Sequence, residues 1–166
     1  TDMIIQMKTI PRPGETLLGG KFSIAPGGKG ANQAVGAARA ARPGTQVIFV
    51  AKVGKDIFGE QAITGFKKDK IQTDYVFQDS NNPSGVALIF VADDGKNSIA
   101  VASGANSALS PADDKKPSQA IKNADILVLQ LETPLETVRT AIEIADQAGV
   151  PIILNPAPVQ KLPPEI

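Results

Sequence analysis

The strongest constraint on this fold is a strand–helix–strand unit near the end of the chain. Residues 125–131 (DILVLQL) form a nearly continuous apolar run, typical of a parallel-sheet strand that is buried on both faces. A helical stretch over residues 134–148 follows, with a proline at its start and Gly149 at its end. Residues 151–154 are a second apolar run. Because parallel strands need a crossover connection, usually a helix, this order predicts an α/β fold.

The first half of the chain shows the same alternation. Residues 31–41 are alanine-rich and are predicted to form a helix. Residues 46–50 form a short apolar run, and residues 57–68 carry apolar side chains at helical spacing. We therefore expect one mostly parallel central sheet, flanked by helices, with strands near 46–50, 125–131 and 151–154.

Two further stretches predict a β-layer that is separate from the central sheet. Residues 2–10 read as a strand that ends at a Pro-Arg-Pro-Gly breaker, and we assign it to the α/β core. Residues 15–25 read as a hairpin or a curved edge strand interrupted by two glycines. Residues 84–92 and 97–102 read as two strands around an Asp-Asp-Gly-Lys turn. We assign residues 15–25 and 84–102 to a small β-sheet that serves as a lid, a dimer interface or both.

Composition excludes several classes of function. The 166 residues contain 17 Lys and Arg against 17 Asp and Glu, so the basic excess that is typical of a nucleic-acid binder is absent. The sequence has no cysteine and no histidine, which removes disulfides, thiolate or imidazole metal ligands, and histidine bases. We see neither an apolar run long enough to span a membrane nor a signal-peptide pattern. We therefore expect no nucleic-acid partner, no membrane partner and a cytoplasmic location.

The most informative segment is the glycine-rich loop Pro-Gly-Gly-Lys-Gly at residues 26–30, which opens a helix. It is not a Walker A loop, because Gly30 follows Lys29 where Ser or Thr is required, and it is not a dinucleotide fingerprint, because position 33 is Gln33. A tight turn that leads into a helix, with a solvated lysine, is one interpretation. Lys29 and Asn32 lie three residues apart on one helix face, however, which favours a ligand contact.

The glycine loop and a series of further motifs resemble the ribokinase branch of the PfkB-type carbohydrate kinases. The loop motif Gly-Gly-Lys-Gly-Ala-Asn-Gln is specific within that superfamily. The resemblance covers essentially the whole chain and implies a ribokinase-like, Rossmann-type α/β fold: a mostly parallel sheet flanked by helices, with a small β-sheet lid. The motifs are Pro-Gly-Glu-Thr at 13–16, the loop at 27–34, Gly-Lys-Asp at 54–56 with Gly59, Ser-Gly-Val-Ala-Leu-Ile at 84–89, Ser-Gly-Ala-Asn at 103–106, Gln-Leu-Glu at 130–132 and Asn-Pro-Ala-Pro at 155–158.

The resemblance also implies a set of sugar-binding residues. Asp2 and Glu132 would accept hydrogen bonds from sugar hydroxyls, and the backbone N–H groups of the glycine loop would approach the sugar closely. The complete implied set is Asp2, Gly27, Gly28, Lys29, Asn32 and Glu132.

Several of these residues also fit an ordinary structural role. Asp2 by itself reads as an exposed acid near a chain end, and Glu132 reads equally as a first-turn acid of the helix that begins near residue 134. Ala87, Ile89 and Val101 alternate along their strands, so they are predicted either to line the apolar face of the sugar or to pack the lid.

The resemblance implies a kinase that converts D-ribose to ribose 5-phosphate with ATP and Mg²⁺, and possible activation by a monovalent cation bound outside this stretch. The family's base and phosphate-binding nest lie in a late Gly-Ala-Gly-Asp-type motif, which does not occur here. We therefore expect residues 1–166 to be the N-terminal, sugar-binding half of a ribokinase-like domain, with no catalytic base, no metal ligand and no activity of its own. We also expect a homodimer formed through the lid. The alternatives are a family kinase for another sugar or a nucleoside, and a non-catalytic sugar-binding or interaction module.

Overall fold

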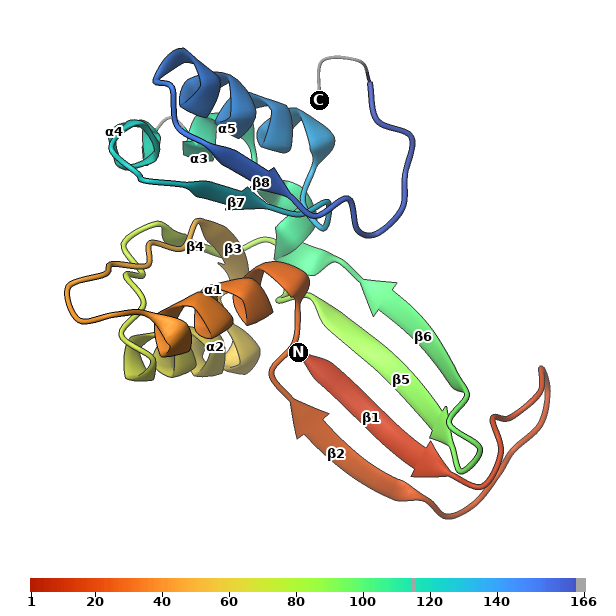
Figure 1. Cartoon of the computed structure of the whole chain (residues 1–166). Helices are drawn as coiled ribbons and strands as arrows, with labels where there is room; N and C mark the ends of the chain where they lie inside the picture. The colour runs from red at the N-terminus through yellow and green to blue at the C-terminus, as the bar shows by residue number, and fades with distance from the viewer. Residues whose placement is uncertain (115, 164–166) are drawn as a thin grey trace.

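The computed structural model describes residues 1–114 and 116–163 as a two-lobed α/β body with a sheet that projects from it (Figure 1). We call this sheet the projecting sheet; its strand order is β2-β1-β5-β6. β1 runs parallel to β5, whereas β2 and β6 are antiparallel to their neighbours. Its strands are β1 (Asp2–Met7), β2 (Lys21–Ala25), β5 (Val86–Ala92) and β6 (Asn97–Ala102).

The body contains two pairs of parallel strands, one in each lobe. In one lobe β3 (Ala51–Gly54) pairs with β4 (Val76–Asp79), and in the other β7 (Leu127–Leu129) pairs with β8 (Ile152–Leu154). The body helices, in chain order, are α1 (Lys29–Ala40), α2 (Ile57–Lys68), the 3-10 helix η1 (Gly104–Ala108), α3 (Pro111–Asp114), α4 (Ser118–Lys122) and α5 (Leu135–Gln147).

Each lobe has its own apolar core. The core of the β3–β4 lobe includes Ala34 from α1 and Phe66 from α2, whose ring meets Phe49 edge to face at 5.1 Å between centroids. The core of the β7–β8 lobe forms where Ala141 and Ala145 of α5 pack beside Ile121 of α4. Alanine at these α5 positions lets the helix lie close to β7 and β8.

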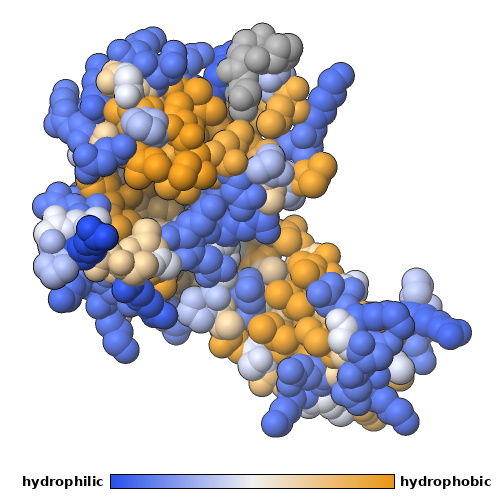
Figure 2. Space-filling model, in the orientation of Figure 1, coloured by the Kyte–Doolittle hydropathy of each residue, from blue (hydrophilic) through white to orange (hydrophobic). Residues whose placement is uncertain are grey.

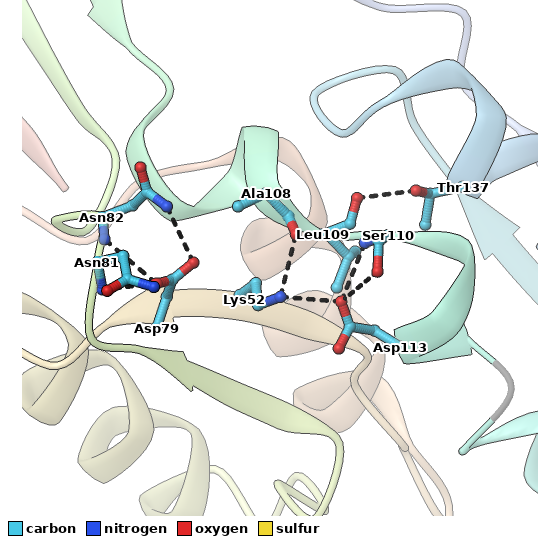
Figure 3. A network of polar contacts seen from close by, with 9 residues as sticks. All are labelled: Lys52, Asp79, Asn81, Asn82, Ala108, Leu109, Ser110, Asp113 and Thr137. Atoms are coloured by element: carbon cyan, nitrogen blue, oxygen red, sulfur yellow. Dashed lines mark hydrogen bonds and ion pairs between the residues drawn. The ribbon is translucent and has the colours of Figure 1, made fainter.

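Polar contacts join the two lobes near η1 and α3 (Figure 3). The Lys52 Nζ atom on β3 donates to the Ala108 carbonyl oxygen at 3.0 Å and to Asp113 Oδ2 at 2.9 Å. Thr137 Oγ1 on α5 donates to the Leu109 carbonyl oxygen at 2.8 Å, a contact that is buried. The segment between η1 and α3 is therefore bonded to a strand of one lobe and to a helix of the other.

Several predicted elements are confirmed. The helix over 57–68 is α2, which begins after Asp56 because that side chain accepts a hydrogen bond from the Gly59 N–H. The predicted strands 84–92 and 97–102 form β5 and β6 around the expected turn, and they belong to a sheet apart from the body.

Four predicted strands are wrong in extent or position. The first strand ends at Met7 and not at residue 10, and it lies in the projecting sheet and not in the α/β core. The strand predicted over 125–131 is only β7, Leu127–Leu129. In the range 15–25 only β2 is a strand, because Gly19 and Gly20 have φ of 98° and 103°, outside the strand region. The range 46–50 makes a single bridge, Ile48 to Gln72, and the true strand β3 follows it.

The predicted central sheet also differs from the structure. Within the described residues the β3–β4 and β7–β8 pairs are separate sheets, and β4 was not predicted at all. The strands at 125–131 and 151–154 are not buried on both faces: Ile126, Val128 and Ile153 are 46%, 41% and 53% exposed. Only the face toward α4 and α5 is covered. No helix in the described part of the chain is long and apolar enough to cross a membrane.

Candidate functional site

The glycine loop connects the projecting sheet to the body. It runs from the end of β2 at Ala25 to the start of α1 at Lys29, and Gly28 has φ of 96°, in the region that favours glycine. At Gly27 an added Cβ would overlap the carboxyl group of Asp2, so that carboxylate lies directly against the loop. The structure thus brings Asp2 and Gly27 together, as the family resemblance implied.

Lys29 and Glu132 meet at the first turn of α1. The Lys29 backbone N–H donates to Glu132 Oε2 at 2.6 Å, and the Lys29 Nζ lies 3.4 Å from Glu132 Oε1. A carboxylate is favourable here because the free N–H groups at a helix start carry partial positive charge. Glu132 therefore interacts with the start of α1, and the alternative in which it is only a first-turn acid of α5 does not describe its contacts.

Gln130 is a further residue at this junction. An added Cβ on Gly30 would lie 2.9 Å from Gln130 Oε1, so α1 approaches the segment after β7 as closely as only glycine allows. The sequence offered one signal for this residue, its place in the Gln-Leu-Glu motif at 130–132. The structure ends β7 at Leu129, so Gln130 lies just beyond a parallel strand, where α/β proteins gather ligand contacts. Gln130 and Glu132 both follow β7, and both approach the first turn of α1.

Asn32 is placed differently. It is exposed on α1, its N–H donates to the Gly28 carbonyl oxygen at 2.9 Å, and its side chain makes no hydrogen bond to another residue in the described ranges. The structure brings the Asn32 backbone to the glycine loop but gives its side-chain amide no partner there. The amide is therefore accessible to a small molecule beside the loop.

The predicted lid residues share one face of the projecting sheet with Asp2. Asp2 lies opposite Ala87, and Ala87 lies opposite Val101, which places the three in one row across β1, β5 and β6. Ile89 lies two positions further along β5, opposite Ile4. Ala87 and Val101 are therefore the apolar side chains in the row of Asp2, and Ile89 is one row away. A hollow of about 620 Å³ lies at the far end of the sheet, around Lys8 and Gly20, and includes none of the predicted site residues.

A second polar cluster holds the start of β5. Asp56 Oδ2 accepts from the Ser84 N–H at 2.7 Å, and Asp56 Oδ1 accepts from the Ser84 hydroxyl at 2.7 Å and from the Gly59 N–H at 2.9 Å. The Ser84 oxygen in turn accepts from the Gly54 N–H at 2.9 Å. Burial raises the pKa of the Asp56 carboxyl, but these hydrogen bonds outweigh that effect and leave the pKa below its ordinary value of 3.8.

This lowered pKa predicts an acid-dependent contribution to stability. A carboxyl whose pKa is lower in the folded state stabilises the fold above its unfolded-state pKa, and the contribution disappears as pH falls through the folded-state value. Asp56→Asn should cost about 1–3 kcal/mol at neutral pH because one donor loses its acceptor. The difference from the original protein should be constant above about pH 5 and shrink below pH 3.8. Denaturant titrations over a pH series measure this, and a constant difference at every pH would contradict it.

The residues present do not fit a nucleotide–magnesium site. Within residues 1–114 and 116–163 no group of three or more Asp, Glu, His or Cys side chains is arranged to hold a metal ion. The two carboxylates of the candidate site lie apart from other acidic groups, Glu132 beside Lys29 and Asp2 against Gly27. We therefore derive no catalytic step through Mg²⁺ or ATP from these residues.

The fold is that of ribokinase-like carbohydrate kinases. The model of the pfkB family of carbohydrate kinases matches residues 2–165, and the chain belongs to this family. It is 42% identical over 161 residues to the ribokinase of Schizosaccharomyces pombe, covering 95% of this chain and 51% of that protein. It is 43% identical over 157 residues to a deoxyribokinase of Salmonella typhi, covering 95% of this chain and 50% of that protein.

A solved structure agrees with these relatives. An Arabidopsis thaliana ribokinase complexed with ribose and ATP superposes with a TM-score of 0.79 at 32% identity, covering 94% of this chain and 50% of that one. The ribokinase resemblance and the ribokinase-like α/β fold predicted from the sequence are confirmed. The chain spans about half the length of the relatives that it matches.

Proposed function

We propose that the protein to which this chain belongs phosphorylates D-ribose to ribose 5-phosphate, and that residues 1–166 supply its sugar-binding part. The observation that carries the proposal is the meeting of the Asp2 carboxylate, the glycine loop and the Lys29–Glu132 pair at the base of the projecting sheet. Carboxylates that accept, a lysine and an amide that donate, and bare backbone N–H groups form a set suited to a polyhydroxylated ligand. The ribokinase relatives and the ribose-bound structure support ribose as that ligand.

In this proposal each side chain has one role. Asp2 and Glu132 accept hydrogen bonds from hydroxyl groups, and the Lys29 ammonium and the Asn32 amide donate to hydroxyl oxygens. The projecting sheet acts as a lid, whose Ala87 and Val101 contact the apolar face of the sugar. ATP, Mg²⁺ and the base that deprotonates the sugar hydroxyl belong to parts of the protein outside these 166 residues. The isolated stretch is therefore expected to bind sugar without phosphorylating it.

A panel of sugars tests the substrate assignment. The full protein should give its highest specificity constant with D-ribose among ribose, deoxyribose, fructose and adenosine. Deoxyribose is the second candidate, because a deoxyribokinase matches the chain as closely as the ribokinases do. A site built to bind a hydroxyl discriminates strongly against an analogue that lacks it, so the two sugars should be clearly separated. Preference for fructose or adenosine would reject the ribose assignment.

Asn32→Ala should weaken ribose binding without changing the fold. The exposed amide makes no side-chain hydrogen bond in the described part of the chain, so its loss removes only a ligand contact. We expect an affinity for ribose lower by about 5- to 150-fold, the equivalent of about 1–3 kcal/mol for an unpaired polar partner. Titration calorimetry measures this, with Asn97→Ala on exposed β6 as the control. Equal ribose affinity of the two variants would remove Asn32 from the site.

We also propose that a second copy of the chain covers the apolar face of the projecting sheet. This face is opposite to the one that carries Asp2, and Figure 2 shows apolar side chains gathered on the sheet. Phe22, Ile24 and Leu88 on it are 62%, 51% and 48% exposed, and apolar groups of this size rarely remain exposed together in a monomer. The face consists of Met3, Ile5, Phe22, Ile24, Leu88 and Phe90.

Leu88→Glu should therefore produce a folded monomer, because a charge at the centre of the contact cannot be buried without a partner. Ser23→Glu, on the other face of β2, should leave the dimer intact. Light scattering distinguishes the two variants. An original protein that is monomeric at every working concentration would contradict the proposal.

A further inference from the structure

The projecting sheet is joined to the body at one end. Asp2 begins β1 opposite the last residue of β2, Ala25, and Val86 begins β5 opposite the last residue of β6, Ala102. The chain crosses between sheet and body at these strand ends, whereas the opposite end of the sheet extends away from both lobes (Figure 1). The orientation of the whole sheet therefore depends on how a few residues at its root are held.

One root connection is fixed by buried polar contacts. Ser84, directly before β5, is 8% exposed, and both its N–H and its hydroxyl donate to the Asp56 carboxylate at 2.7 Å. The Ser84 oxygen also accepts from the Gly54 N–H at the end of β3. These bonds join the start of β5 to the end of β3 and to the first turn of α2.

Close backbone packing encloses the same root. An added Cβ on Gly85 would lie 2.7 Å from the Ser103 carbonyl oxygen, and one on Gly104 would overlap the Pro83 carbonyl oxygen. The Pro83 oxygen also accepts from the Ala105 N–H at 2.8 Å. The entry to β5 and the exit from β6 are thus packed against each other without room for a methyl group.

The third crossing, from β2 to α1, is held by fewer contacts. The loop from Ala25 to Lys29 contains Gly28 at φ of 96°, and an added Cβ there would meet only Glu132 Oε2, at 3.9 Å. Its anchoring hydrogen bond, from Lys29 N–H to Glu132, involves residues whose side chains are 41% and 32% exposed. The entry to β5 and the exit from β6 are therefore closely packed, whereas the loop from β2 to α1 is glycine-rich and more open to solvent.

We infer that Asp56 and Ser84 are positioning residues. Their contact, which we call the pivot, fixes the root of the projecting sheet and so determines the orientation of the sheet over the candidate sugar site. Asp2, Ala87 and Val101 lie in the first row that spans β1, β5 and β6, one residue beyond the Val86–Ala102 pair at which β5 begins. A change at the pivot therefore moves them relative to Lys29 and Glu132 on the body. The role as a lid rests on the proposed function, whereas the role as a pivot is a property of the fold.

Two substitutions loosen the pivot in different ways. Asp56→Ser keeps a side chain that caps α2 through the Gly59 N–H, but it is too short to reach Ser84. Ser84→Ala removes the hydroxyl that bonds to Asp56 and Gly54 and keeps the Ser84 N–H bond to Asp56. Ile121→Val, in the core of the β7–β8 lobe, is the control for a general loss of stability.

Because the sequence has no cysteine, two introduced cysteines can be labelled without background. We place nitroxide labels at exposed Asn97 on β6 and exposed Gln147 on α5, and measure their distance distribution with unlabelled protein in excess so that only pairs within one molecule contribute. With no sugar present, Asp56→Ser and Ser84→Ala should widen the distance distribution about twofold, because both remove hydrogen bonds that hold the root of the sheet. Ile121→Val leaves these bonds in place and should not change the width.

Equal widths in the original protein and all three variants, or equal widening in all three variants, would contradict the proposal that Asp56 and Ser84 form the pivot. If Asp56→Ser does not fold, Ser84→Ala decides the result alone. A separate ribose titration keeps the two proposals distinct. Failure of the original protein to bind ribose rejects the proposed function, while the sugar-free distributions still decide the pivot.

Discussion

Gly59→Ala is expected to lower the free energy of unfolding by about 2–3 kcal/mol, whereas Gly65→Ala on the same helix should raise it by about 0.5–1 kcal/mol. At Gly59 an added Cβ would overlap the Gly54 carbonyl oxygen, a backbone atom that cannot turn aside. At Gly65 nothing lies within 4 Å of an added Cβ. There alanine only improves helix propensity and restricts the unfolded chain.

Denaturant unfolding of the two variants measures this difference directly. Both variants replace glycine by alanine on α2, so the effect of helix propensity is the same in both. The difference between them therefore measures the close contact of Gly59 with the end of β3. A loss of stability at Gly65 as large as the loss at Gly59 would show that α2 does not approach β3 in the way described.

Gly27→Ala is expected to reduce ribose affinity by about 10- to 150-fold, because hydrogen bonds to a charged group contribute about 1.5–3 kcal/mol each. An alanine methyl group at this position would overlap the Asp2 carboxyl group and push it out of the site. Gly27 does not have a positive φ, so the substitution tests the Asp2 contact and not the backbone conformation.

Gly36→Ala is the matched control, since it lies on exposed α1 with nothing within 4 Å of an added Cβ. Its ribose affinity should equal that of the original protein in a calorimetric titration. Unchanged affinity in a folded Gly27→Ala variant would mean that Asp2 does not bind the sugar from its present position.

Elements with local signals could be predicted from the sequence. α2 has an Asp56 cap, apolar residues at helical spacing and lysines in its last turn, so its bounds follow from the chain itself. The hairpin of β5 and β6 could likewise be predicted, because the Asp-Asp-Gly-Lys segment between the two strands is a recognisable turn. β3 was misplaced because its position depends on pairing with β4, about 25 residues later, and β4 (VFQD) shows no alternation of apolar and polar residues.

The candidate site could be predicted only in part. The glycine loop is recognisable as a ligand-approach segment, but Lys29 and Glu132 are 103 residues apart, and no local pattern connects them. The family resemblance placed both residues in the sugar-binding set, but it did not predict that they pair with each other. The sequence analysis named Asp56 and Ser84 only as members of family motifs and did not predict their contact. That contact depends on the end of β3, the start of α2 and the start of β5 coming together in the fold.

The uncovered face of the β7–β8 pair affects how residues 1–166 behave in solution on their own. Ile126, Val128 and Ile153 form an apolar surface on parallel strands, and unprotected strand surfaces of this kind promote self-association. The sequence has a formal net charge of zero at pH 7 and a pI near 6.2, so charge repulsion between molecules is weakest in the neutral range. Because the sequence has neither histidine nor cysteine, few groups titrate between about pH 5 and 9, so the colloidal solubility of residues 1–166 should pass through a broad minimum over this range.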